Sequence, residues 1–115
     1  MVIDSSALIA LLLGERETAD LVAAIATASR RVVSAPTYLE TAIVILARSG
    51  PKAQEKLDCL LNDLEIEVVP FARDQAALAI TAYRQYGKGS GHVAALNFGD
   101  CFSYAMAKLR DEPLQ

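Results

Sequence analysis

Apolar residues recur along the chain with two different spacings, and the alternation between them predicts an α/β fold. Short apolar runs at 2–3, 32–34 and 66–69 are typical of buried strands. Between these runs, apolar residues repeat every three or four positions, as they do on one face of a helix. The predicted helices cover residues 7–13, 15–28, 36 to the Ser49-Gly50-Pro51 break, 53–64, 73–86, and a last stretch that begins near 97.

The helical periodicity also predicts which side chains share a face. Residues Ala53 to Leu64 place their apolar positions on one stripe, and the other helices have similar stripes. One face groups Leu39, Ile43, Leu46 and Ala47; we expect Ala76, Ala79, Ile80 and Tyr83 to point inward, together with Phe98, Cys101, Phe102, Ala105 and Leu109.

The order of the predicted elements indicates a single domain over residues 1–115. Short strands alternate with helices, and no hairpin signal joins any two strands. Parallel strands connected by crossover helices follow from this order. The expected architecture is therefore a three-layer α/β/α sandwich with a small parallel sheet.

Composition narrows the function without identifying it. The chain is 53% hydrophobic and has a net charge of −3, so it can bury a core but lacks the basic excess of a general nucleic-acid-binding surface. A cluster of carboxylates that binds divalent cations remains compatible with that charge. The two cysteines form no zinc motif, and no glycine-rich phosphate-binding motif follows a strand, which argues against a cofactor-binding α/β domain.

The N-terminal segment predicts a cytoplasmic protein. Its first residues, Met-Val-Ile-Asp, contain no basic leader, and the apolar run 7–13 is too short to span a bilayer.

Three acidic residues occupy comparable places in the predicted fold. Asp4 ends the first strand, Glu40 lies early in the helix after the second strand, and Asp100 lies in the first turn of the last helix. Ligands of open parallel sheets gather outside the carboxyl ends of the strands, so we expect these acids at one edge. Converging carboxylates repel one another unless a cation lies among them, and hard oxygen ligands suit Mg²⁺ or Mn²⁺.

Each acid also has a capping interpretation. Asp4 is placed to cap the first helix, Glu40 follows Thr37 at capping-box spacing, and Asp100 follows Asn97 in the same way. Spacing alone leaves a metal site and a set of helix caps both open.

The sequence resembles the PIN-domain toxins of the VapC type, the ribonuclease halves of VapBC toxin–antitoxin pairs. The resemblance rests on the opening MVIDSSALIALLLGE, the middle SAPTYLETAIVILAR and, most specifically, LNFGDCFSYAMAK near the end. It covers essentially the whole chain in order. It implies a PIN-like fold in which Mg²⁺ or Mn²⁺, held by Asp4, Asp100 and Glu40, activates water for attack on an RNA phosphodiester. Ser6 matches the hydroxyl residue that supports the first acid.

The resemblance also implies partners: an RNA substrate, a cognate VapB-type antitoxin whose C-terminal segment covers the acidic pocket, and a second copy in a homodimer. The glycine-rich loop 87–95 offers Lys88 as an RNA phosphate contact, whereas the lone His92 has no partner for an acid–base relay.

One departure from the family pattern leaves an alternative. Family members continue past the Glu-Pro-Leu segment into a further strand and a loop with another Asp, which we expect to be absent here because the sequence stops at Gln115. The alternative function is a catalytically impaired PIN domain that only dimerises and binds an antitoxin.

Overall fold

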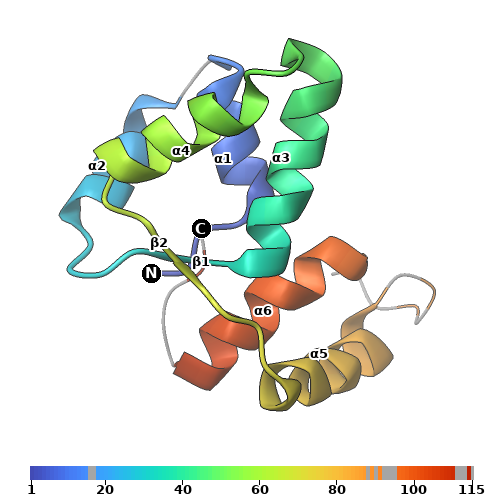
Figure 1. The fold of residues 1–115 in the computed structure, drawn as a ribbon. Helices are drawn as coiled ribbons and strands as arrows, with labels where there is room; N and C mark the ends of the chain where they lie inside the picture. The colour runs from blue at the N-terminus through green and yellow to red at the C-terminus, as the bar shows by residue number, and fades with distance from the viewer. Residues whose placement is uncertain (16–17, 88, 90, 92–95, 111–113, 115) are drawn as a thin grey trace.

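The computed structural model has the predicted alternation of helices and short parallel strands, arranged in layers (Figure 1). It describes residues 1–15, 18–87, 89, 91, 96–110 and 114. Within these residues the elements are, in order, α1 (Ser5–Leu12), α2 (Ala19–Thr27), β1 (Val32–Ser34), α3 (Ala35–Ser49), α4 (Ala53–Asp63), β2 (Glu67–Val69), α5 (Arg73–Tyr86) and α6 (Phe98–Arg110).

The sheet is small and parallel, as expected. Strands β1 and β2 pair in parallel, with Val33 opposite Val68. The first predicted strand is reduced to Val2, which makes isolated parallel bridges to Val32 and to Leu114. The Ile3 amide donates to the Val32 carbonyl at 2.8 Å. The chain therefore leaves the sheet at Asp4, beside the carboxyl end of β1.

Side chains alternate between the two faces of the sheet, which is why both faces carry helices. Ile3 and Val33 pack with Leu8, Ile25 and the buried residues of α4 on one face. Val2, Val32 and Val69 pack against Met106 of α6 on the other face. Helix α5 packs in turn against α6 (Figure 1). This packing places α6 against the N-terminal segment that ends at Asp4, with Met106 and Val2 in the same hydrophobic cluster.

The start of α3 is fixed by its own sequence. Ser34 is the N-cap residue, its hydroxyl oxygen accepts from the Thr37 amide at 3.2 Å, and Pro36 lies in the first turn, where its missing N–H is harmless. Because the helix begins at Ala35, Glu40 lies in its second turn. The capping-box interpretation of Thr37 and Glu40 is therefore wrong.

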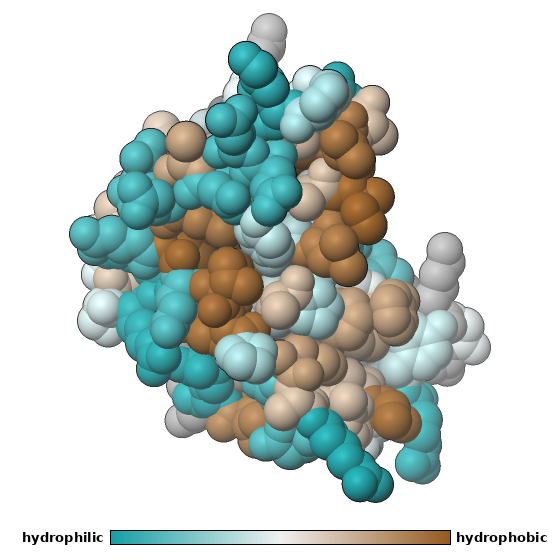
Figure 2. Space-filling model, in the orientation of Figure 1, coloured by the Kyte–Doolittle hydropathy of each residue, from teal (hydrophilic) through white to brown (hydrophobic). Residues whose placement is uncertain are grey.

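Several inward-facing assignments are also wrong. Phe98 is 77% exposed, Ile80 is 64% exposed, and Tyr83 and Leu109 are exposed as well. On α3 the buried side chains are Thr37, Thr41 and Ile45, whereas the apolar stripe of Leu39, Ile43 and Leu46 faces outward. Periodicity identified which residues share a face but not which face is buried. In Figure 2 the brown, hydrophobic atoms along α3 continue as paler brown atoms toward α5 and α6.

Within the described part of the chain, no helix combines the length and apolar character needed to cross a bilayer.

Candidate functional site

Asp4 occupies the N-cap position of α1, but its carboxylate does not cap the helix. Instead it accepts two hydroxyl hydrogen bonds from different parts of the chain. Ser6 Oγ donates to Asp4 Oδ2 at 3.1 Å, and Ser103 Oγ of α6 donates to Asp4 Oδ1 at 2.6 Å. Ser5 and Ser6 lie inside α1, in its first turn. The Asp4 carboxylate is thus fixed at the junction between the sheet and α6.

Asp100 takes part in the reciprocal cap expected from its spacing to Asn97. The Asn97 amide donates to Asp100 Oδ2 at 3.0 Å, and the Asp100 amide donates to Asn97 Oδ1 at 2.8 Å. These bonds satisfy amides at the start of α6 and fix the rotamer of Asp100. Capping and metal binding remain compatible, because a carboxylate has about four lone pairs.

Asp4 and Asp100 line the same pocket, although 96 positions separate them in the sequence. The pocket has a volume of about 270 Å³, and its other lining residues are Ser6, Leu96, Tyr104 and Leu114. The two acids form one part of its wall, and the rest is the Ser6 hydroxyl, a phenol ring and two leucine side chains.

Glu40 lies in a neighbouring apolar pocket, together with Phe98, Gly99 and Phe102 of α6. Its carboxylate lies against Gly99: a Cβ atom added there would be 2.9 Å from Glu40 Oε1. Among the described residues, the buried Oε1 has no hydrogen-bond partner. Glu40 thus reaches the first turn of α6 beside Asp100, but it lines a different pocket from the other two acids.

The described residues contain no group of three or more His, Cys, Asp or Glu side chains that could hold a metal ion. Two carboxylates share a pocket and the third lies next to it. Lys88, the expected phosphate contact, and His92 lie outside the described residues.

The chemistry of the donors fits a hydrated Mg²⁺ or Mn²⁺ ion. Such ions usually keep several waters and use only one or two protein carboxylates together with substrate phosphate oxygens. Asp4 and Asp100 supply that minimal set of hard ligands. A buried carboxylate oxygen without a donor, such as Glu40 Oε1, is also a group that a nearby cation would stabilise.

Sequence reasoning missed two residues of α6 near the acids, Ser103 and Tyr104. Both lie within one helical turn of Asp100, at i+3 and i+4, so they belong to the same face. That spacing was a usable signal. Gly99 inside a helix was another, because glycine weakens a helix and commonly marks close packing.

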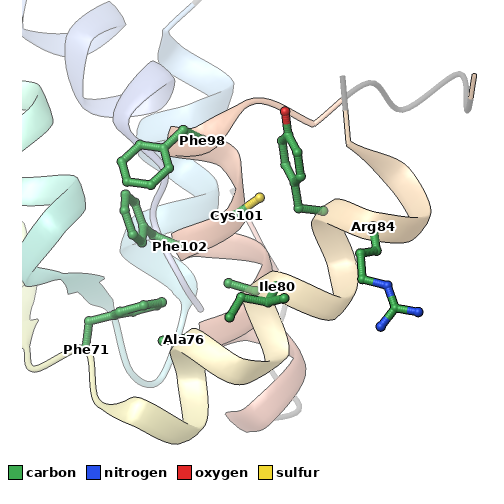
Figure 3. A pocket seen from close by; sticks show the side chains of 9 residues that line it. Phe71, Ala76, Ile80, Arg84, Phe98, Cys101 and Phe102 are labelled. Carbon is green, nitrogen blue, oxygen red and sulfur yellow. The ribbon is translucent and has the colours of Figure 1, made fainter. Parts of the chain in front are cut away.

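The opposite face of α6 borders an apolar pocket between α5 and α6. Figure 3 shows the rings of Phe98, Phe102 and Phe71 one after another along the wall of this pocket, with the Arg84 guanidinium pointing away from it. The Phe98 and Phe102 rings meet edge to face, with centroids 4.8 Å apart. Burial, and to a lesser extent the Asp100 charge, raises the pKa of the Cys101 thiol in this pocket. This thiol is a core group without features of a nucleophile.

The sequence and the fold both match known proteins. The PIN domain family matches residues 1–114. Ribonuclease VapC of Mycolicibacterium smegmatis is 48% identical over 114 residues, which span 99% of this chain and 88% of that protein. Ribonuclease VapC28 of Mycobacterium tuberculosis is 46% identical, over 99% of this chain and 86% of that protein.

Solved structures share the fold at low sequence identity. A chain described as a toxin-antitoxin complex from Klebsiella pneumoniae superposes with a TM-score of 0.73 and 18% identity, covering 98% of this chain and 82% of that one. Mycobacterium tuberculosis VapC20, described as a sarcin-ricin loop cleaving toxin, gives 0.72 and 16%, covering 96% and 83%. The predicted PIN-like α/β fold is therefore confirmed.

Proposed function

Because the chain belongs to the PIN-domain family and, within it, to the VapC ribonucleases, we propose that it is a Mg²⁺- or Mn²⁺-dependent endoribonuclease toxin of a toxin–antitoxin pair. The observation that carries the proposal is the shared pocket of Asp4 and Asp100. Relatives of this similarity over nearly the whole chain are named ribonucleases, and two carboxylates in one pocket suit a metal-assisted hydrolysis.

In this proposal Asp4 and Asp100 are the residues that would hold the cation. A bound Mg²⁺ or Mn²⁺ would supply Lewis acidity, which lowers the pKa of the attacking water and stabilises negative charge on the phosphate oxygens. The Ser6 hydroxyl, which donates to Asp4 Oδ2, keeps that carboxylate in place. Glu40, which reaches α6 at Gly99, would orient a water molecule or complete a second metal position.

The substrate proposed for this pocket is RNA. Negative charge at the pocket would repel a phosphodiester in the absence of a cation, so metal binding and substrate binding should be coupled. Tyr104 and Leu96 offer an apolar wall next to the acids, which suits a ribose or a base. Lys88 is proposed as a phosphate contact on sequence grounds alone.

Two protein partners complete the proposal. The structural neighbour described as a toxin-antitoxin complex supports an antitoxin partner, which we propose to be of the VapB type and to cover the acidic pocket. The second partner is another copy of the chain. Exposed apolar side chains of α3, α5 and α6, among them Leu39, Ile80 and Phe98, border two apolar pockets that Asp4 and Asp100 do not line, although Glu40 lines one of them. A homodimer through this apolar surface would leave the pocket shared by Asp4 and Asp100 accessible in each copy.

The test is cleavage of RNA in the presence of Mg²⁺ or Mn²⁺, resolved on denaturing gels. We expect Asp4→Asn and Asp100→Asn each to reduce the cleavage rate at least 100-fold, because each keeps the side-chain volume but removes a charged ligand. The matched control is Asp20→Asn, which changes an exposed acid of α2 by the same single charge.

Wild-type activity that disappears with a chelator and is restored by Mn²⁺ would support the metal requirement. Cleavage that survives both pocket substitutions would contradict the proposal. An inactive wild-type chain that still self-associates would favour the alternative, a PIN domain that only binds partners.

A further inference from the structure

We propose that Ser103 is a positioning residue for the metal site, which holds the Asp4 carboxylate at a fixed distance from that of Asp100. The inference rests on the proposed function, since it assigns a role within the same acidic pocket. Its basis is a hydrogen bond from Ser103 Oγ to Asp4 Oδ1 of 2.6 Å, between residues 99 positions apart in the sequence.

The bond has the features of a strong, protected interaction. Ser103 is only 2% exposed, so water competes poorly for its hydroxyl. A hydroxyl has a single hydrogen, and here it is donated to Asp4. A length of 2.6 Å lies in the range of charge-assisted O–H···O⁻ bonds, which are stronger than neutral ones.

The two hydroxyls on Asp4 differ in what they connect. Ser6 is two residues from Asp4, exposed, and 3.1 Å from Oδ2, so it fixes only the local rotamer. Ser103 belongs to α6, the helix that also carries Asp100 one turn earlier. Its bond therefore ties the N-terminal segment directly to the helix that supplies the second acid. The separation of the two carboxylates depends on this connection.

Loss of the Ser103 hydroxyl should therefore weaken cation binding more than it weakens the fold. Without it, Oδ1 of Asp4 loses its buried donor and the carboxylate can rotate away from Asp100. Removing a group that orients a metal ligand typically lowers metal affinity 10- to 100-fold. A hydroxyl with a purely structural role would lower stability and leave the affinity of the folded protein unchanged.

The test is the Mn²⁺ dissociation constant, measured by titration and electron paramagnetic resonance on the full chain. We expect Ser103→Ala to raise this constant at least tenfold, and Ser6→Ala to raise it less. The matched control is Thr41→Val, which removes another buried hydroxyl, one that donates to the Thr37 carbonyl within α3 at 2.8 Å. Thr41→Val should lower the melting temperature and leave Mn²⁺ binding unchanged.

The variants separate this inference from the proposed function. Wild type that binds no Mn²⁺ would overturn both. Wild type that binds Mn²⁺ with Ser103→Ala binding equally well would overturn the inference alone, as would an equal effect of Thr41→Val. If Ser103→Ala does not fold, Ser103→Cys decides, because it fills the site with a weaker donor. Wild-type affinity in that folded variant would likewise overturn the role of Ser103.

Discussion

The two faces of α6 differ in almost every respect. One face carries Asp100, Ser103 and Tyr104, which surround or support the pocket shared with Asp4. The other carries Phe98 and Phe102, which border apolar pockets toward α3 and α5. The first face is held by hydrogen bonds to Asn97 and to Asp4 of the N-terminal segment, whereas the second leaves Phe98 77% exposed.

The difference teaches how one helix can serve two purposes. The polar face needs precise placement, because a metal ligand is useful only within a narrow range of positions. The apolar face needs only to remain open, since an exposed group of large hydrophobic side chains is available to another protein surface. Changes on the two faces should therefore separate catalysis from association.

The largest effect that sharpens this contrast is expected from Phe98→Ser. Phe98 is 77% exposed in the single chain, so its loss should change the melting temperature little. If it is an anchor of the proposed homodimer, its loss should weaken self-association about 30-fold, as removal of a ~2 kcal/mol contact does. Analytical ultracentrifugation over a concentration series measures this change.

The control for Phe98→Ser is Val22→Ser, which removes an exposed apolar side chain from α2. The control should self-associate as wild type does, and both variants should retain Mn²⁺ binding at the pocket of Asp4 and Asp100, which neither residue lines. Unchanged self-association of Phe98→Ser would separate the apolar face from dimer formation.

A smaller effect, on RNA cleavage, is expected from Gly99→Ala, since Gly99 lies between the two faces of α6. The added methyl group would lie against the Glu40 carboxylate, with Oε1 2.9 Å away, and would push that side chain out of place. We expect about a tenfold loss of RNA cleavage, the lower end of what a displaced orienting group costs. Alanine is otherwise favourable inside a helix, so stability should fall little.

A double-variant cycle checks the cause. In a Glu40→Ala background the added methyl group meets no carboxylate, so Gly99→Ala should have no further effect on cleavage. An equal loss in both backgrounds would show that Gly99 acts through something other than Glu40.

Much of the fold could be predicted from the sequence, because it depends on local signals. The strand at 32–34, the break at Gly50 and the helix over 73–86 follow from β-branched runs, glycine and periodicity, and the structure has all three. The orientation of the helices could not be predicted in the same way. On α3 a threonine face is buried, since Thr41 bonds the Thr37 carbonyl within its own helix, and the leucine stripe is left outside.

The candidate site shows the same division. The positions of Asp4 and Asp100 could be predicted from a strand end and a helix start. Short motifs also indicate their nearby hydrogen bonds, from Ser6 to Asp4 and between Asn97 and Asp100. The bond between Ser103 and Asp4 joins positions 99 apart, so no local pattern predicts it. The position of Glu40 against Gly99 likewise depends on how α3 packs on α6.

The most direct test of the account is Mn²⁺ binding to wild type, Asp4→Asn, Asp100→Asn and the double variant, with Asp20→Asn as the charge-matched control. If one cation lies between the two carboxylates, each single substitution should weaken binding at least tenfold, the double substitution should add little to the larger single effect, and Asp20→Asn should bind as wild type does. Binding that is unchanged in both single variants would contradict a shared metal site.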